Sequence, residues 1–323
     1  MMRSLARLLG DEFSGFVLEN EPLSRHTTIR IGGPAAFFIE ADDLRSLTFA
    51  CDACRKLGVP WTMFGKGSNL LVSDAGFNGA VITLGAGFAK CAFDAEAGVL
   101  TLGAGLRLSQ AVREAASLGR SGLEFAVGIP GTVGGAVVQN IGAYGVELAE
   151  RLSSVTVYDR AEKVVRVLTV EECDFSYRHS IMKTEAGRNF VVLSVTLRLP
   201  AVWTPVLGYK DLEAEIEARG LTAETVTAPV MSEIVRAVRA RKLPDPAVIG
   251  NAGSFFTNPI VTKVHWHELL TKHPSLVYYR LGGGRMKLAA AWLIEAAGFK
   301  GLAEGPAGVY EHHALIIVNR GGA

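Results

Sequence analysis

The chain has 323 residues, of which 49% are hydrophobic and 20% are charged, and its formal net charge is +1. This composition is ordinary for a protein with a substantial core, and the length predicts two or three domains. The balanced charge argues against a nucleic-acid partner, and no apolar run reaches the roughly 20 residues that a membrane span needs.

The first two thirds of the chain are predicted to be strands interrupted by two helices. Residues 35–41 have a strand pattern, and apolar residues at helical spacing predict an amphipathic helix over 42–58. A second helix is expected at 107–118. The other strands expected here are 61–64, 70–73, 80–84, 99–103, 152–159, 163–168 and 190–199.

A proline-flanked break over 200–205 separates this part from the rest. Beyond it, helices are expected at about 231–241, 263–272 and 286–297, followed by a strand at 314–318. Because strands and helices do not alternate strictly, the pattern favours the α+β class over a doubly wound sheet.

The four cysteines and the paired histidines have ordinary explanations. Cys51 and Cys54 spell C-x-x-C, but both fall on the apolar face of the expected helix, so core packing is favoured over redox or zinc chemistry. Free cysteines fit a cytoplasmic protein, and the first ten residues are too short for a signal peptide. The pairs His265/His267 and His312/His313 lack further ligands, so no metal site is expected.

A basic run precedes a proline-containing segment. Arg236 and Arg239 share one helical face, which is expected to be solvated. Lys242 comes directly before 243–246, where two prolines fix the chain, and is therefore a better candidate for a phosphate contact.

Two glycine-containing segments point to an anionic ligand. Gly65, Lys66, Gly67, Ser68, Asn69 and Leu70 directly follow an expected strand, and the backbone N–H groups of such a turn can face an anion. The order matches neither a P-loop nor a Rossmann fingerprint. Taken alone, the loop is equally well explained as a turn.

The second segment, residues 128–145, contains six glycines in eighteen positions. Ordering so many glycines is costly in conformational entropy. Backbone that must lie close to a large flat cofactor and its pyrophosphate would need them.

Five motifs in order carry a family resemblance. They are GKGSNLLV (65–72), GIPGTVGGAVVQNIGAYG (128–145), Tyr177-Arg178, KLPDP (242–246) and GNAGSFFTNP (250–259). With these motifs the chain resembles the UDP-N-acetylenolpyruvoylglucosamine reductases of the first subtype, from about residue 27 to residue 319.

The resemblance implies a two-lobed FAD-binding fold of the vanillyl-alcohol-oxidase (PCMH) type with an α/β substrate-binding domain. The FAD-binding region would be 26–200, with lobes at about 26–88 and 89–200, and the substrate domain 201–323. The residues implied at FAD are Gly65, Lys66, Gly67, Ser68, Asn69, Leu70, Gly128, Ile129, Pro130, Gly131, Thr132, Gly134, Gly135, Asn140, Ala143, Tyr144 and Gly145.

The implied reaction has two halves: NADPH reduces FAD, and the flavin then reduces UDP-N-acetylglucosamine enolpyruvate to UDP-N-acetylmuramate for peptidoglycan synthesis. Arg178 matches the residue that steadies charge beside the substrate carboxylate, although a surface salt bridge is the alternative from the residues alone. Ser254 matches the proton donor, and Tyr209, Lys242 and Asn258 match substrate-binding positions. His313 stands where the family often has glutamine, near the substrate. A monomer is expected.

One family feature has no match. The family's third catalytic residue is a glutamate near the C-terminus, and neither Glu304 nor Glu311 occupies its position. The chain is therefore expected to be C-terminally truncated. Two alternatives stay open: an inactive flavin-binding remnant, and another oxidoreductase of this flavin fold, such as an alcohol oxidase.

Overall fold

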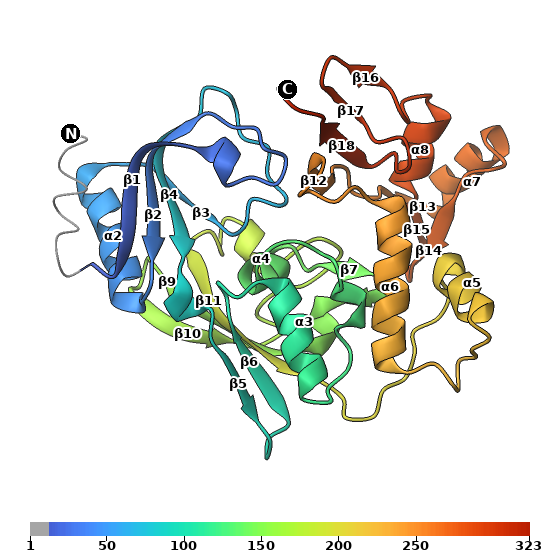
Figure 1. Ribbon diagram of the computed structural model, residues 1–323, viewed down its shortest axis with the longest axis horizontal. Helices are drawn as coiled ribbons and strands as arrows, with labels where there is room; N and C mark the ends of the chain where they lie inside the picture. The colour runs from blue at the N-terminus through green and yellow to red at the C-terminus, as the bar shows by residue number, and fades with distance from the viewer. Residues whose placement is uncertain (1–12) are drawn as a thin grey trace. The chain divides into compact units, whose positions relative to one another are not determined.

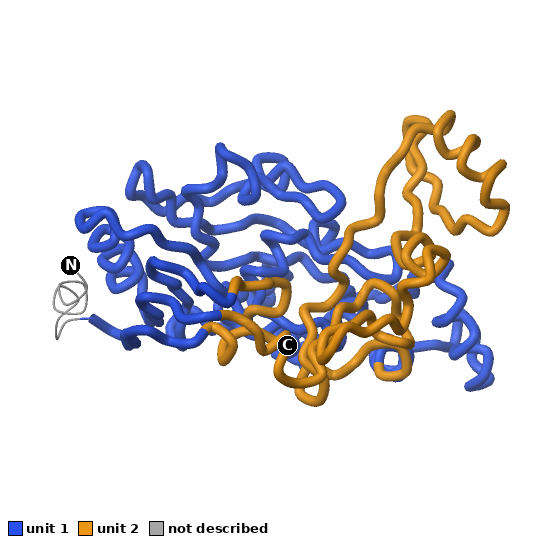
Figure 2. Tube along the Cα trace, turned by 90° about the horizontal axis from the view of Figure 1, so that it is seen from above, with its two compact units in different colours: residues 1–22, 33–66, 74–239 blue, residues 23–32, 67–73, 240–323 orange. Residues whose placement is uncertain are grey.

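Strands and helices follow each other without regular alternation in residues 13–323, which are the residues that this computed structural model describes (Figure 1). This confirms the predicted α+β class. Unit 1 comprises the described residues up to 22 together with 33–66 and 74–239, and unit 2 comprises 23–32, 67–73 and 240–323 (Figure 2). Within the described range, no helix is long and apolar enough to cross a membrane.

The first sheet of unit 1 has four strands in the order β1-β2-β4-β3. β2 pairs antiparallel with β1 and parallel with β4, and β4 pairs parallel with β3. Helix α2 (Leu44–Leu57) packs against this sheet, as predicted from its apolar face. The strands are β1 (Gly15–Pro22), β2 (Pro34–Ala41), β3 (Trp61–Phe64) and β4 (Phe77–Leu84).

Cys51 and Cys54 lie in the core between α2 and this sheet, where they contact an apolar cluster that includes Ile39 and Ile82. Burial raises the pKa of the Cys51 thiol to about 12 and that of Cys54 to about 11. The thiols are therefore neutral at ordinary pH and serve as small apolar side chains, which confirms the packing prediction.

The second sheet of unit 1 has five antiparallel strands in the order β10-β9-β11-β6-β5. Helices α3 (Leu108–Ser117) and α4 (Val133–Val138) contribute buried residues to the core on this sheet. The strands are β5 (Cys91–Asp94), β6 (Val99–Gly103), β9 (Leu152–Asp159), β10 (Val164–Leu168) and β11 (Phe190–Arg198). The 3-10 turns of the unit are η2 (Ala86–Phe88), η3 (Glu124–Ala126), η4 (Leu148–Arg151) and η5 (Ile181–Lys183).

Helices α5 (Lys210–Ala218) and α6 (Ala228–Lys242) share a separate apolar cluster, in which Leu212 packs with Ile234 and Val238. Val127, next to the glycine-rich segment, belongs to the same cluster. The buried side chains in the first turns and the middle of α6 therefore pack against other parts of unit 1. The predicted helix at 231–241 is confirmed with a start three residues earlier.

Unit 2 holds two small sheets, with orders β12-β18-β17-β16 and β13-β15-β14. Their pairings are antiparallel. The elements are η1 (Leu23–Arg25), β12 (Gly250–Ser254), β13 (Ile260–Thr262), α7 (Lys263–Lys272), β14 (Tyr278–Arg280), β15 (Arg285–Leu288), α8 (Ala290–Ala296), β16 (Ala303–Glu304), β17 (Ala307–Val309) and β18 (Ile316–Asn319).

Two element predictions were wrong. Residues 70–73 form no strand, because no neighbouring strand pairs with them; Leu71 is 58% exposed. The helix expected at 286–297 begins only at Ala290, because 285–288 form the central strand of a three-stranded sheet. The functional boundary expected at 200/201 remains a prediction, and the first compact unit continues past it to residue 239.

Candidate functional site

A tight hairpin carries three of the predicted cofactor residues. β7 (Gly142–Ala143) pairs with β8 (Val146–Glu147), which leaves Tyr144 and Gly145 as a two-residue turn. Both have positive φ, 53° and 82°, as a type I′ turn requires. The Tyr144 ring meets the ring of Tyr209 edge to face, with centroids 5.5 Å apart. The structure thus brings a predicted cofactor residue against a predicted substrate residue.

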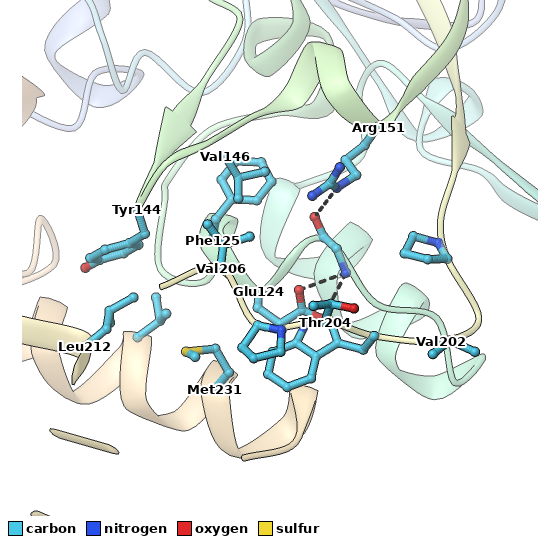
Figure 3. A pocket seen from close by; sticks show the side chains of 15 residues that line it. Glu124, Phe125, Tyr144, Val146, Arg151, Val202, Thr204, Val206, Leu212 and Met231 are labelled. Atoms are coloured by element: carbon cyan, nitrogen blue, oxygen red, sulfur yellow. Dashed lines mark hydrogen bonds between the residues drawn. The ribbon is translucent and has the colours of Figure 1, made fainter. Parts of the chain in front are cut away.

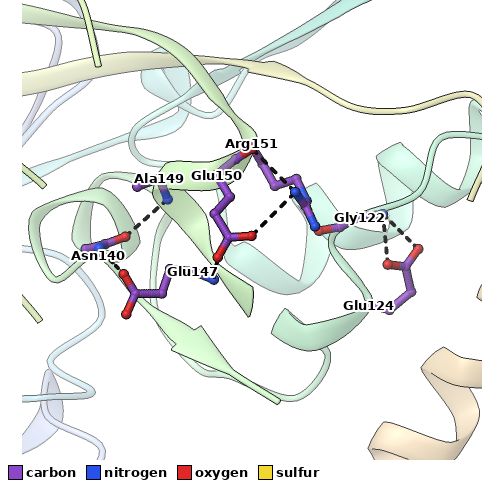
Figure 4. Close-up of polar contacts among 7 residues, drawn as sticks. All are labelled: Gly122, Glu124, Asn140, Glu147, Ala149, Glu150 and Arg151. Carbon is purple, nitrogen blue, oxygen red and sulfur yellow. Dashed lines mark hydrogen bonds and ion pairs between the residues drawn. The ribbon is translucent and has the colours of Figure 1, made fainter. Parts of the chain in front are cut away.

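Asn140 holds this hairpin in place (Figure 4). Its side chain is fully buried, its amide donates to Glu147 Oε2 at 2.8 Å and to the Ser176 carbonyl at 2.9 Å, and its oxygen accepts from Ala149 N–H at 3.1 Å. These bonds occupy the side chain within the protein. The Asn140 side chain therefore positions the β7–β8 hairpin. A contact between Asn140 and the cofactor stays a prediction.

Arg178 lies at the tip of a turn closed by Ser176 and His179, with φ 56°. Its guanidinium donates to the carbonyls of Asn140 at 3.1 Å and Gly142 at 2.6 Å. Arg178 makes no ion pair with any residue in 13–323, so the surface salt bridge considered from the sequence is not present. Two of its five N–H donors are used, and three remain for a ligand.

Lys183 supports the same turn and was not anticipated from the sequence. Its ammonium donates to the Arg178 carbonyl at 2.8 Å and to Gln139 Oε1 at 3.0 Å. Partial burial and the nearby Arg178 charge lower the pKa of Lys183. In the sequence, the only indication of this role is that Lys183 lies five residues after Arg178.

The glycine-rich segment 128–136 uses most of its backbone donors internally. Val133 and Gly134 donate to the carbonyls of Leu106 and Ala104, and Thr132 Oγ1 caps α4 by accepting from Gly135 N–H at 3.3 Å. Gly134 is explained by packing, because a Cβ there would lie 2.9 Å from that of Ala104.

The N–H groups of Gly128 and of the adjacent pair Gly131 and Thr132 are different, since none of them donates to any acceptor among the described residues. Thr132 is itself buried, and Gly131 has φ 124°. Backbone N–H groups in this arrangement suit an anionic oxygen such as that of a pyrophosphate. The segment therefore fits the predicted cofactor, through these residues rather than along its whole length.

The loop at 65–70 begins in unit 1 and continues in unit 2. In unit 1, a Cβ on Gly65 would lie 2.8 Å from Thr132 Oγ1, so this loop passes close to the glycine-rich segment. In unit 2, Gly67 has φ 59°, and a Cβ there would collide with the His26 carbonyl at 2.1 Å. Both glycines are required by these close approaches.

Ser254 is exposed at the end of β12 in unit 2. The preceding Gly253 has φ 70°, and its Cβ position lies 4.0 Å from the Ser68 carbonyl. The predicted proton donor and the second half of the predicted cofactor loop are therefore neighbours within one compact unit.

The other predicted substrate residues of unit 2 also have structural contacts. Asn258 Oδ1 accepts from the Ala290 N–H at 2.9 Å, at the start of α8. His313 is half-buried, and its Nδ1 accepts from Leu315 N–H at 3.3 Å. Lys242 is exposed at the last residue of α6. The proposed substrate contacts of all three remain predictions.

The solvated face predicted for Arg236 and Arg239 is right only for Arg236, which is exposed. Arg239 is half-buried, and its guanidinium donates to the Gly128 carbonyl at 3.2 Å. Burial lowers the pKa of Arg239, and the electrostatic influence of Tyr144 opposes that shift. The prediction failed because helical periodicity does not reveal which tertiary partner reaches a polar position.

A cavity of about 320 Å³ lies beside Tyr144 within unit 1 (Figure 3). Its walls are largely apolar and include Phe125 and Met231, with the Glu124 carboxylate among them. Burial raises the pKa of Glu124. Arg151 also lines the cavity, but its charge faces the nearby Glu124, and the mostly apolar walls suit a diphosphate poorly. Among the described residues, no group of three or more His, Cys, Asp or Glu side chains could hold a metal ion.

Comparison with known proteins gives two family matches. Residues 35–168 match an FAD binding domain, and residues 245–323 match the C-terminal domain of UDP-N-acetylenolpyruvoylglucosamine reductase. The chain is 42% identical over 302 residues to the UDP-N-acetylenolpyruvoylglucosamine reductase of Cupriavidus pinatubonensis, covering 93% of this chain and 88% of that protein. The enzyme of that name from an Azoarcus species is 46% identical over 271 residues, with coverage of 82% and 77%.

A solved structure is also similar. The crystal structure of UDP-N-acetylenolpyruvylglucosamine reductase from Thermus caldophilus superimposes with a TM-score of 0.64 at 30% identity. The match covers 96% of this chain and 90% of that one.

Proposed function

Because the chain belongs to the UDP-N-acetylenolpyruvoylglucosamine reductase family, we propose that it reduces UDP-N-acetylglucosamine enolpyruvate to UDP-N-acetylmuramate, with NADPH as the hydride source. The predicted family and the predicted FAD-binding fold are confirmed by the same matches. The protein is thus an FAD-dependent oxidoreductase of peptidoglycan synthesis. The observation that supports the specific reaction is the position of Arg178. Two backbone carbonyls already hold its guanidinium, and three of its N–H donors are still available.

Bound FAD would supply the hydride chemistry, accepting hydride from a nicotinamide and delivering it to the carbon–carbon double bond of the enolpyruvyl group. On the protein side, Gly131 and Thr132 would donate backbone N–H groups to its pyrophosphate. The loop 65–70 would lie along the same group. The turn residues Ala143, Tyr144 and Gly145 would lie by the flavin.

Arg178 would bind the substrate carboxylate and stabilise the negative charge that develops beside it. A guanidinium pairs with a planar carboxylate through two parallel hydrogen bonds and keeps its charge at any working pH. Since the carbonyls of Asn140 and Gly142 already hold the guanidinium, little reorganisation is needed when the charge appears.

Ser254 would then donate a proton to C2 of the reduced substrate. A serine hydroxyl is a weak acid, so this role requires a strongly basic carbanion-like centre. Tyr209, Lys242, Asn258 and His313 would bind the UDP-sugar, with the ammonium of Lys242 on the diphosphate. The exposure of Ser254 and Lys242 leaves both side chains accessible to a ligand.

The test follows the visible flavin band under anaerobic conditions, with NADPH added first and UDP-N-acetylglucosamine enolpyruvate second. We expect bleaching and then return of the band. Absence of flavin after purification and reconstitution would refute the proposal. Bleaching without return would favour the alternative of a flavin-binding remnant, and oxygen consumption with small alcohols would favour an alcohol oxidase.

Matched variants separate the two half-reactions. Ser254→Ala should leave bleaching by NADPH unchanged and slow the return of the band by about 10²–10⁴-fold. Arg178→Lys should also act on the second step, because an ammonium lacks the bidentate geometry. Equal slowing of both steps in Ser254→Ala would contradict the proton-donor role.

A further inference from the structure

We propose that Lys183 is a positioning residue that holds Arg178 in the orientation needed to bind the substrate carboxylate. The contact on which this role depends is the hydrogen bond that the Lys183 ammonium donates to the Arg178 carbonyl at 2.8 Å. The role rests on the proposed function and deepens it, because it gives a structural reason for selecting a ligand that carries a carboxylate.

The backbone of Arg178 has a conformation that needs support from outside its turn. Ser176 and His179 exchange backbone hydrogen bonds at 3.2 and 3.0 Å, which leaves Tyr177 and Arg178 as the two central residues. Arg178 takes the second central position with φ 56°, where glycine is favoured because a Cβ is crowded in the left-handed region. Such a conformation persists only where the surrounding structure holds it, and it is typical of functional sites.

Lys183 supplies that support from a position five residues further along the chain. Its ammonium bridges the Arg178 carbonyl, at 2.8 Å, and Gln139 Oε1, at 3.0 Å. Gln139 ends α4, a helix that contributes buried residues to the core of unit 1, so the lysine ties the turn to a fixed element. Hydrogen bonds from a charged donor are stronger than neutral ones, and this one fixes the peptide plane that follows Arg178.

A buried hydroxyl attaches the chain between these two residues to the same stretch. The Ser180 side chain is fully buried, and its Oγ donates to the Val138 carbonyl at 2.7 Å. The Arg178 guanidinium donates to two carbonyls within 138–142, and its own carbonyl is joined to this stretch through Lys183. Arg178 is therefore held at both its backbone and its guanidinium by one continuous piece of unit 1.

A salt bridge does not explain the position of Lys183. Within residues 13–323, neither Lys183 nor Arg178 forms an ion pair. Partial burial and then the charge of Arg178 lower the pKa of Lys183, as expected for two cations that lie near each other. Like charges repel, so this arrangement is unfavourable until an anion joins it. The carboxylate of the proposed substrate is an anion of the required kind.

Loss of the ammonium would free the Arg178 carbonyl and let the turn relax toward ordinary backbone conformations. The guanidinium would then less often have the geometry for two parallel hydrogen bonds to a carboxylate. Ligands that carry the carboxylate would bind more weakly, whereas a UDP-sugar without it would bind as before. A lysine that only stabilised the fold would show no such selectivity.

The experiment measures Kd by calorimetry on the intact, FAD-saturated protein for two ligands. UDP-N-acetylmuramate carries the carboxylate, and UDP-N-acetylglucosamine is the same nucleotide sugar without it. Lys183→Met keeps the length of the side chain and removes its donors. The Kd for UDP-N-acetylmuramate should rise by about tenfold, as for a lost hydrogen bond from a charged group, with no change for UDP-N-acetylglucosamine. Lys183→Arg, which keeps charged donors, should recover part of the loss.

The matched control is Lys163→Met, which should leave both Kd values unchanged. Lys163 is also an exposed lysine of unit 1 with a short polar contact, 2.8 Å to Asp52.

A second comparison separates positioning from direct attraction between the ammonium and the ligand. In an Arg178→Met background, Lys183→Met should not weaken binding of UDP-N-acetylmuramate further, because the lysine acts through the arginine. Direct attraction would survive in that background. If Lys183→Met does not fold, Gln139→Leu removes the second acceptor of the same ammonium without a change of charge, and it should raise the Kd for UDP-N-acetylmuramate selectively.

Three results would overturn the role of Lys183 in a protein that distinguishes the two ligands. They are equal Kd values for Lys183→Met and Lys163→Met, equal weakening of both ligands by Lys183→Met, and a loss that persists undiminished in the Arg178→Met background. A wild-type protein that binds both ligands equally, with no effect of Arg178→Met on either, would instead refute the carboxylate contact in the proposed function. The behaviour of the unmodified protein therefore distinguishes the two failures.

Discussion

At the scale of single residues, Asn140 is expected to be the most sensitive polar side chain of the candidate site. Replacing it with alanine removes three hydrogen bonds and leaves the half-buried Glu147 and Ala149 without this partner, and alanine is less suited than asparagine to φ 40°. Each unsatisfied buried group costs about 1–3 kcal/mol. We expect Asn140→Ala to lower the free energy of unfolding by roughly 3 kcal/mol, measured by urea denaturation.

The control for Asn140 is Asn78→Ala, because Asn78 is exposed on β4. A change at such a surface position is expected to stay within about 0.5 kcal/mol. Equal effects of the two substitutions would show that the buried hydrogen bonds of Asn140 add nothing.

The buried thiols give a prediction for alkaline pH. The pKa values of Cys51 and Cys54 are raised to about 12 and 11, above the ordinary value of 9.0 that applies in the unfolded chain. Above pH 9 the unfolded state therefore loses protons that the folded state keeps, so rising pH favours unfolding. Each thiol should reduce the free energy of unfolding by about 1.4 kcal/mol per pH unit between pH 9 and 11.

The check is to measure the free energy of unfolding against pH for the double variant Cys51→Ala/Cys54→Ala. Its decline between pH 9 and 11 should be shallower than that of the wild type. Leu47→Ala, which empties space in the same cluster without removing an ionisable group, should lower the curve and keep its slope. A wild-type slope in the cysteine variant would contradict the assignment.

Single residues also show where sequence reasoning stops. Arg178 and Ser254 were assigned because each stands in a recognisable motif, and the structure explains how Arg178 is held. Arg239 was misassigned and Lys183 was missed, because the Gly128 carbonyl bound by Arg239 is 111 residues away and the Gln139 side chain bound by Lys183 is 44 residues away. Neither periodicity nor spacing carries that information.

At the scale of elements, the N-terminal cap of α2 offers a clear test. Asp43 accepts from Ser46 N–H at 2.7 Å, and this bond is the largest cause of the lowered pKa of Asp43. The ionised cap stabilises the helix above pH 4, and the benefit is lost as the pH falls and the carboxylate is protonated. Asp43→Ala should cost about 1 kcal/mol of unfolding free energy at neutral pH.

Asp52→Ala on the same helix is the matched control for the cap. Asp52 pairs with Arg55 at 3.0 Å and Lys163 at 2.8 Å, but all three side chains are exposed. Exposed ion pairs contribute little, so the loss should be no more than about 0.5 kcal/mol. A larger loss at Asp52 than at Asp43 would reverse the expected order of the two effects.

Elements were predictable where local signals agreed. The helix at 44–57 has apolar periodicity, a capping aspartate and a left-handed Gly58 at its end, and its prediction was accurate. By contrast, 70–73 and 286–297 contain apolar runs, and whether such a run forms a strand depends on the strands available to pair with it. Residues 285–288 have partners on both sides and become a strand, whereas 70–73 have none.

At the scale of the whole molecule, sequence order and compact units do not coincide. Residues 23–32 and 67–73 belong to unit 2 together with 240–323, although more than 160 residues of sequence separate the last two segments. The family resemblance anticipated the fold and its cofactor class, but not this division, because the contacts that define it are long-range.

The polar contacts inside unit 2 predict that residues 240–323 do not fold alone. Asn251 is buried, its N–H donates to the Thr28 carbonyl at 3.1 Å, and its carbonyl accepts from Thr28 Oγ1 at 2.7 Å. Asn319, also buried, donates to the Ile29 carbonyl at 3.0 Å. Without residues 23–32, strands β12 and β18 would bury polar groups that have lost their partners.

The expected result for the separate fragment 240–323 is a collapsed backbone amide spectrum by NMR, whereas the intact chain under the same conditions gives dispersed signals. In the intact chain, Asn319→Ala should lower the free energy of unfolding by about 1–3 kcal/mol, because it leaves the Ile29 carbonyl unpaired. Dispersed signals from the isolated fragment would mean that its apolar clusters suffice for folding. The segments contributed from 23–32 and 67–73 would then be additions to a pre-formed unit rather than parts of its core.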